Sequence, residues 1–172
     1  MRIYTIGHGT RPAEELVACL REAGVRTLVD VRRFPGSRRN PQFNRDTLDE
    51  SLAATGIRYV HALELGGRRS GEAGADRFAC IETPAFRSYA ARMGSPAWQT
   101  ALAEALAHPV PAFMCAETLW WRCHRRFIAE LLTARGHDVV HLLRPGERRP
   151  HRMSEDATVL DGRLYLCGVL VA

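Results

Sequence analysis

Short apolar runs alternate along this chain with longer segments in which apolar residues recur every three or four positions. The runs at residues 2–6, 26–31, 57–61, 110–115 and 138–143 are typical of buried β-strands. Helices are predicted from the cap at Thr10 to Gly24, from Asn44 to Gly56, after Thr83-Pro84, after Ser95-Pro96, and from Cys123 to Arg135.

This order of elements predicts the fold class. Strands that alternate with helices form right-handed βαβ units, with helices on both faces of the sheet. We therefore expect a single α/β domain over residues 1–172, a three-layer α/β/α sandwich with a mainly parallel sheet of about five strands. The pair Asp161-Gly162, which lies between two β-rich runs, predicts a C-terminal β-hairpin. The longest segment without periodicity covers residues 62–82, and loops of that length are usually functional or disordered.

The predicted parallel sheet brings distant polar residues together. Ligands of such sheets bind beyond the carboxyl ends of the strands. Residues at or just after those ends are Gly7-His8-Gly9, Asp30 and Arg32, His61, Cys115 and Glu117, and His141. We expect these groups to share one edge of the sheet.

The charged residues narrow the range of partners. All 24 basic residues are arginine, which excludes a lysine Schiff base, a lysine general base and the lysine of a P-loop. The net charge of +5 favours an anionic partner, either a small molecule or a nucleic acid. Arginine also presents a planar fork that suits phosphate or carboxylate.

The cellular location of the protein and the redox state of its cysteines are predicted from features that the sequence lacks. No apolar run approaches the roughly 20 residues of a membrane helix, and the first residues do not resemble a signal peptide. A cytoplasmic protein without a membrane partner is expected, and the oligomeric state is left open. The five cysteines are an odd, scattered set, so reduced thiols are predicted, with Cys19 and Cys167 as small core residues.

Several motifs resemble a known family in their content and order. They are "YTIGHGT", "LVDVRRFPGSRRNPQFN", "IRYVHALELGG", "CAETLWWRCHRR" and "VVHLLRP" followed by "HRMSEDA". Together they are similar to the domain of unknown function 488 family over nearly the whole chain. The resemblance implies a compact α/β domain and leaves the reaction open.

The segment 113–126, "FMCAETLWWRCHRR", carries the predicted catalytic residues: Cys123, Glu117, His124 and Cys115. Cys123 is expected in the first turn of a helix, where unpaired amides and neighbouring cations lower the pKa of a thiol. Burial by Trp120 or Trp121 would raise the pKa of Glu117 and make it an acid or base. A known cysteine-phosphatase or rhodanese loop is not expected, because two tryptophans fill the place of its small residues.

A second group is predicted to bind the substrate or its anion: His8, Asp30, Arg32, Ser37, Arg38 and Arg125. A buried aspartate needs a partner, so Asp30 is expected to hold an arginine or to accept from a ligand. The alternative is that Asp30 and Arg32 form a purely structural ion pair that contacts no ligand. Fourteen of the arginines lie in segments 32–45, 68–69, 122–126 and 144–152 and would form a positive rim if these segments converge.

The leading interpretation is an enzyme that acts on a phosphate-bearing substrate, a nucleotide or nucleic acid. One alternative is a non-enzymatic nucleic-acid-binding module in which Phe34, Phe43, Trp120 and Trp121 stack on bases. Another is a redox or metal-sensing protein. No cofactor is expected; a metal held by Cys115, Cys123, His124, Glu117 and His8 is the weaker option, because C-x7-C-H lacks the close spacing of structural zinc sites.

Overall fold

The computed structural model describes all 172 residues, and its main sheet has six strands. They are β1 (Arg2–Gly7), β2 (Thr27–Asp30), β3 (Arg58–His61), β4 (Pro111–Cys115), β5 (Asp138–Arg144) and β6 (Glu147–Pro150). Their order across the sheet is β3-β2-β4-β1-β5-β6. The first five strands are parallel, and β6 runs antiparallel to β5. The predicted α/β class and mainly parallel sheet are confirmed.

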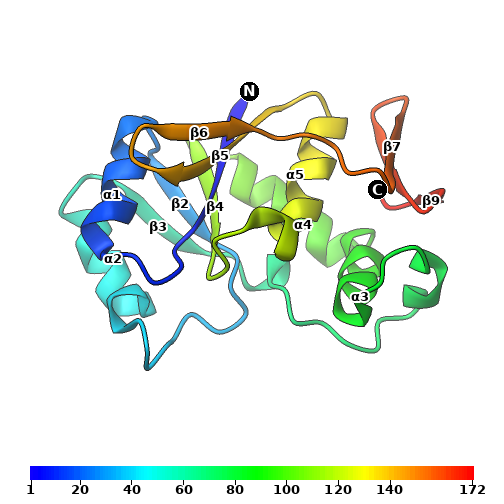
Figure 1. The fold of residues 1–172 in the computed structure, drawn as a ribbon, viewed down its shortest axis with the longest axis horizontal. Coiled ribbons are helices and arrows are strands. Elements are labelled where there is room, and N and C mark those ends of the chain that lie inside the picture. Colours follow the sequence, from blue (N-terminus) through cyan, green and yellow to red (C-terminus); the bar gives the residue numbers. More distant parts are fainter.

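Helices cover both faces of this sheet (Figure 1). Helices α1 (Ala13–Glu22) and α2 (Arg45–Ala53) lie on one face. Helices α3 (Pro84–Met93), α4 (Pro96–Leu106) and α5 (Arg125–Ala134) lie on the other. Short 3-10 turns occur at η1 (Pro41–Phe43), η2 (Leu63–Leu65), η3 (Ala75–Phe78) and η4 (Trp120–Arg122).

Alternation along the strands divides the core between the two faces. Successive side chains of a strand point to opposite sides. Ile3 and Phe113 pack with α3, α4 and α5, whereas their neighbours Tyr4 and Ala112 pack with α1 and α2. The strands are thus buried on both sides, which explains why they appear in the sequence as unbroken apolar runs.

The C-terminal region contains the predicted hairpin and adds a third strand to it. It forms a separate antiparallel sheet of three strands, β7 (Ala157–Leu160), β8 (Arg163–Leu166) and β9 (Val169–Leu170). Leu164 and Leu166 of β8 are fully buried and belong to the same core as α3, α4 and α5. Asp161 and Gly162 do make the predicted turn, between β7 and β8.

Two cysteines correct the expectation that all thiols are reduced. Cys80, which follows η3, forms a disulfide with Cys167, which lies in the turn between β8 and β9. Cys167 is therefore a cross-link and not a small core residue. Cys19, Cys115 and Cys123 are free and buried. None of the five helices is long and apolar enough to cross a membrane.

The sheet order places a switch point between β1 and β4. The connection that leaves β1 leads through α1 to β2. The connection that leaves β4 leads through α5, on the other face of the sheet, to β5. The two connections diverge, so a crevice opens at the carboxyl ends of these neighbouring strands. This is the edge at which the sequence predicts a site.

Candidate active site

A cavity of about 660 Å³ lies at this switch point. Residues from five segments line it: His8 to Thr10, the loop from Arg32 to Asn40, Gly67 and Arg68, Cys115 to Thr118, and Arg122 to His124. Part of helix α3 closes one side through Phe86 and Tyr89. Its size lies within the range of small-molecule sites.

Glycine allows the loop after β4 to fold over the end of β1. Gly7 lies opposite Cys115 in the sheet, and a Cβ atom on Gly7 would overlap the backbone carbonyl of Glu117. The amide of His8 donates to the carbonyl of Cys115, and that of Gly9 donates to the carbonyl of Ala116, each at 3.0 Å. The strand end that carries Cys115 is thereby fixed against the cavity.

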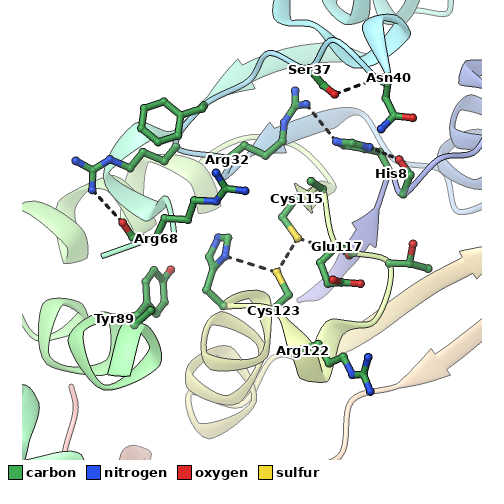
Figure 2. A pocket seen from close by; sticks show the side chains of 18 of the residues that line it. His8, Arg32, Ser37, Asn40, Arg68, Tyr89, Cys115, Glu117, Arg122 and Cys123 are labelled. Atoms are coloured by element: carbon green, nitrogen blue, oxygen red, sulfur yellow. Dashed lines mark hydrogen bonds between the residues drawn. The ribbon is translucent and has the colours of Figure 1, made fainter. Parts of the chain in front are cut away.

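Two thiols meet at the base of the cavity (Figure 2). The Sγ atoms of Cys115 and Cys123 lie 2.6 Å apart, although Cys115 is the last residue of β4 and Cys123 precedes α5. The cysteines are 3% and 5% exposed, and both line the cavity. The predicted helix began at Cys123; in the structure α5 begins at Arg125, with His124 as its N-cap. Cys123 still accepts a hydrogen bond from the backbone amide of Arg125, at 3.4 Å.

Arg125 is buried against these sulfurs. It is 1% exposed and makes no ion pair with an aspartate or glutamate. Its Nε donates to Sγ of Cys115 at 3.0 Å, and its other nitrogens donate to the hydroxyl of Thr5 and the carbonyls of Glu117 and Thr118. A buried cation without a counter-charge costs several kcal/mol. The sulfur pair is the only group at hand to supply the negative charge.

The pKa values of the two thiols are shifted in opposite directions. Burial opposes ionisation of both, and it raises the pKa of Cys115 well above its usual value. For Cys123 this burial is outweighed by the thiol of Cys115, which donates to it, and by the charge and amide of Arg125, so its pKa falls to about 6. The pair therefore titrates as a unit that carries one proton and one negative charge at neutral pH.

His124 presents a nitrogen to Cys123. Its Nε2 lies 3.0 Å from the carbonyl oxygen of Val31, which can only accept, so Nε2 carries the hydrogen. Its Nδ1 is left as an acceptor 3.5 Å from Sγ of Cys123. Burial lowers the pKa of His124, which keeps the free imidazole neutral. Gly67 fits closely behind this ring, since a Cβ there would lie 2.5 Å from Nδ1.

A hydrogen-bonded chain leads from Arg125 away from the cavity. The Thr5 hydroxyl accepts from Arg125, so it donates to Nδ1 of His141 at 2.7 Å, and Nε2 of His141 then donates to Nδ1 of His151 at 3.0 Å. Burial lowers the pKa of His141 to about 3 and that of His151 to about 4. Trp120 stacks on His141 with ring centroids 4.2 Å apart. These neutral groups fix the position of the guanidinium.

Asp30 and Arg32 form a buried ion pair at the end of β2. The carboxylate of Asp30 accepts from Nε and Nη2 of Arg32, the latter at 2.6 Å, and also from the hydroxyl of Tyr59. Arg32 further donates to the carbonyl of Phe43 and to Nε2 of His8. Four of its five N–H groups are thus in use. One Nη1 hydrogen remains on a side chain that lines the cavity.

His8 lines the cavity but is held by protein groups. Its Nε2 accepts from Arg32 at 3.2 Å, its Nδ1 donates to the carbonyl of Gly9 at 2.8 Å, and its ring stacks on Phe43. Burial lowers the pKa of His8 to about 4, so the ring is neutral. His8 therefore helps to hold the side chain of Arg32 in place.

The loop after β2 separates two of the predicted anion-binding residues. Ser37 lines the cavity, and its hydroxyl accepts from the amide of Asn40 at 3.1 Å. Arg38 is exposed and lies outside the cavity lining. Arg125, predicted to face a ligand, instead turns inward toward the sulfurs.

Glu117 corrects another expectation, because the tryptophans after it do not bury it. Its side chain is exposed at the cavity rim and accepts from the amide of Leu119 at 3.2 Å. Trp120 lies over His141, and Trp121 is 45% exposed. Of the four aromatic residues proposed to stack on bases, Phe43 is fully buried.

Arg68 is a cavity residue that the sequence did not single out. Figure 2 shows its side chain reaching toward the two cysteines, while Arg122 points away from them. Arg68 makes no side-chain hydrogen bond or ion pair; its carbonyl accepts from Arg33. Its signals were its place in the long aperiodic segment, after Gly66-Gly67, and its membership of the clustered arginines. Of the fourteen clustered arginines, Arg32, Arg33, Arg68 and Arg122 line the cavity.

Of the five residues named as metal ligands, Cys115, Cys123 and His124 meet at the base of the cavity, whereas Glu117 lies at its rim and His8 is held by Arg32. The structure has no group of three or more histidine, cysteine, aspartate or glutamate residues arranged to hold an ion.

Comparison with known proteins identifies the family alone. No curated protein matches the chain, and no solved structure matches it. One family does, over residues 12–132, a range that contains Arg32, both free thiols of the cavity and Arg125. By that match the chain belongs to the family described as domain of unknown function DUF488.

Proposed function

We propose that this protein is an enzyme that uses the thiolate of Cys123 as a nucleophile on a phosphate-bearing substrate, a nucleotide or nucleic acid. The observation that carries the proposal is the buried guanidinium of Arg125, which donates to the sulfur of Cys115 and has no carboxylate as a partner, while the backbone amide of Arg125 donates to the sulfur of Cys123. A fold has little reason to bury that charge unless one sulfur is ionised. Thiolates are the reactive form of cysteine.

Three neighbours of Cys123 have distinct roles in this proposal. Arg125 is the counter-ion, and the thiol of Cys115 donates a hydrogen bond to the thiolate. Nδ1 of the neutral His124 is free to accept a proton from bound substrate or water during turnover and to return it to the leaving group. The exposed carboxylate of Glu117 is the second acid or base at the rim.

The anion is proposed to bind opposite the thiols. Arg68 offers a guanidinium without a protein partner, and Arg32 offers one remaining N–H, held in place by Asp30. The hydroxyl of Ser37 supplies a further donor. Arginine forks bind phosphate through paired hydrogen bonds, and the cavity has room for a nucleotide.

Protection of Cys123 from alkylation tests the proposal without a known substrate. Nucleoside monophosphates, or orthophosphate alone, are expected to slow iodoacetamide labelling of Cys123, and Arg68→Gln is expected to abolish that protection. A surface variant, Arg21→Gln, is the matched control, because Arg21 is exposed on α1 and lies outside the cavity lining. Equal labelling with and without every phosphate compound would contradict the proposed anion site.

Turnover tests the catalytic half of the proposal. In a screen of nucleotides and phosphate esters, any activity found should be lost in Cys123→Ser. A full rate in that variant would rule out Cys123 as the nucleophile.

The reduced thiol that the chemistry needs also fits the cytoplasmic location that the sequence predicts, whereas the Cys80–Cys167 disulfide would be unusual there.

A nucleic-acid-binding module without catalysis is the second candidate. Phe34 and Trp121 are 63% and 45% exposed, and Arg33 and Arg122 adjoin them in sequence. These groups suit contacts with bases and phosphates. This candidate predicts binding that weakens steeply with salt and persists when Cys115 and Cys123 are both replaced.

A further inference from the structure

The sulfurs of Cys115 and Cys123 lie at a distance close to that of a disulfide bond. Their separation of 2.6 Å is about 0.5 Å longer than the S–S bond of a disulfide. Both residues are anchored, one at the end of a central strand and the other at the start of a helix. A bond between them therefore needs almost no backbone movement.

The environment of the pair is asymmetric. Cys123 accepts from the amide of Arg125 and lies beside the buried guanidinium of the same residue, which are the features of an attacking thiolate. Cys115 is in contact with it and retains its proton. An attacking sulfur with a protonated partner in contact is the arrangement of a peroxide-sensitive cysteine and its resolving cysteine.

We propose that Cys123 is a site of reversible oxidation by hydroperoxides and that Cys115 is its resolving thiol. The inference rests on the proposed function for the identity of the nucleophile and not for the substrate. It adds a second class of reactant, the hydroperoxide, and a regulation of the same site, because a disulfide removes the thiolate on which turnover depends.

The chemistry balances without a metal or cofactor. The Cys123 thiolate attacks the terminal oxygen of the hydroperoxide, so that an S–O bond forms and the O–O bond breaks. The alkoxide that leaves takes up the proton that Cys123 released on ionisation. Sulfur of Cys115 then attacks the sulfenic sulfur, an S–S bond forms, and the departing hydroxide combines with the Cys115 proton as water. Two thiols and one hydroperoxide give one disulfide, one alcohol and one water.

Arg125 makes this oxidation easy to reverse. The disulfide carries no charge, so it leaves the buried guanidinium without its counter-ion. Reduction restores the thiolate and with it the charge pairing. A low-molecular-weight thiol that enters the cavity is expected to reduce the pair by exchange.

Peptide mapping of the wild-type chain tests the inference directly. Trypsin cleaves after arginine, and Arg122 lies between the two cysteines, so peptides 93–122 and 123–125 separate unless a disulfide joins them. Stoichiometric hydrogen peroxide should join these peptides and lower the free thiols from three to one. Separate peptides with sulfinic acid on Cys123, or an unchanged thiol count, would overturn the inference.

Two variants sharpen this test. In Cys115→Ser the oxidation should stop at the sulfenic acid of Cys123, which a 1,3-diketone traps, whereas the wild type should give little trapped product. Cys19→Ala is the matched control, because Cys19 is a buried free thiol on the other face of the sheet, and it should leave the disulfide yield unchanged. Trapping in the wild type as strong as in Cys115→Ser would exclude Cys115 as the resolving thiol.

The outcomes separate this inference from the proposed function. If the disulfide forms but Cys123→Ser retains turnover, the enzymatic proposal fails and the redox pair stands. If turnover needs Cys123 and the peptides never join, the redox pair fails alone.

Discussion

Replacing Arg125 by glutamine should raise the pKa of Cys123 and thereby change how its reactivity depends on pH. The substitution removes the buried guanidinium, which donates to Cys115 and whose charge lowers the pKa of Cys123, and it keeps a side chain able to hydrogen-bond. Burial then acts on the thiol without a charge to oppose it.

The size of this pKa change can be taken from the difference between the pKa of Cys123 in the protein and that of an unperturbed thiol. Cys123 has a pKa of about 6 where an unperturbed thiol has 9.0. A return to the unperturbed value is a shift of three units, or about 4 kcal/mol. At pH 7 the thiolate fraction would fall from about nine-tenths to about one-hundredth.

The labelling rate will change less than the thiolate fraction. A thiolate becomes more nucleophilic as its pKa rises, by roughly 25-fold over three units. The net loss of iodoacetamide labelling should therefore be only about fourfold at pH 7 and roughly 40-fold at pH 5. The midpoint of the pH–rate profile is the sharper measurement, and it should move from about 6 to about 9.

The assay counts alkylated tryptic peptide 123–125 as a function of pH for the wild type, Arg125→Gln and the surface control Arg21→Gln. The control should keep the wild-type midpoint. A midpoint that stays near 6 in Arg125→Gln would refute the assignment of Arg125 as the counter-ion of the thiolate.

Stability provides an independent check with a defined sign. Because the pKa of Cys123 is lower in the folded than in the unfolded chain, its thiolate stabilises the fold above the unfolded pKa of 9.0, and this contribution is lost as pH falls through about 6. The wild type should gain about 3 kcal/mol of unfolding free energy from this group between pH 6 and pH 9, and Arg125→Gln should gain almost none.

Three further changes have outcomes that follow from single contacts. Gly67→Ala should cost about 1–3 kcal/mol in urea unfolding and slow the alkylation of Cys123, because the new methyl group displaces the imidazole of His124. Reduction of the Cys80–Cys167 disulfide, which closes a long loop, should lower the unfolding free energy by about 4–5 kcal/mol in a calorimetric or denaturant measurement. Asp30→Asn should destabilise the protein by about 3–5 kcal/mol, because it leaves a buried guanidinium without its carboxylate, and it should weaken protection by phosphate.

Matched controls decide these three outcomes. Gly36→Ala has open space at its Cβ and should leave stability unchanged. A Gly67→Ala variant as stable and as reactive as Gly36→Ala would contradict the tight packing against His124. Asp138→Asn removes a carboxylate from an exposed ion pair and should cost under about 1 kcal/mol. The disulfide prediction fails if thiol-treated and untreated protein unfold at the same denaturant concentration.

The strands were predictable because burial on both faces leaves a mark in the sequence. The apolar runs predicted β1 to β5 closely, and the rule that ligands bind at the carboxyl ends located the cavity. Strand β6 went unrecognised because three of its four residues are exposed at the sheet edge, where no apolar pattern is required. The bond between Cys80 and Cys167 spans 87 positions, a distance over which no local pattern carries information.

The site was predictable in location and less so in the direction of its side chains. The sequence placed Cys123 and His124 correctly beside Cys115, because all three follow from where β4 ends and α5 begins. It could not show that Arg125 turns inward to Thr5, since that depends on how α5 packs on the sheet. Nor could it distinguish Arg68 from its neighbour Arg69, which donates to the carbonyls of Glu64 and Gly66 instead.

Arg68 also has a left-handed backbone, with φ of 55°. A side chain other than glycine in that conformation is strained by about 1–2 kcal/mol. Arg68→Gly should therefore make the protein more stable while it removes the unpartnered guanidinium from the cavity. Stability and ligand binding would then be opposed at one residue, and a screen for thermostable variants would select the loss of this arginine.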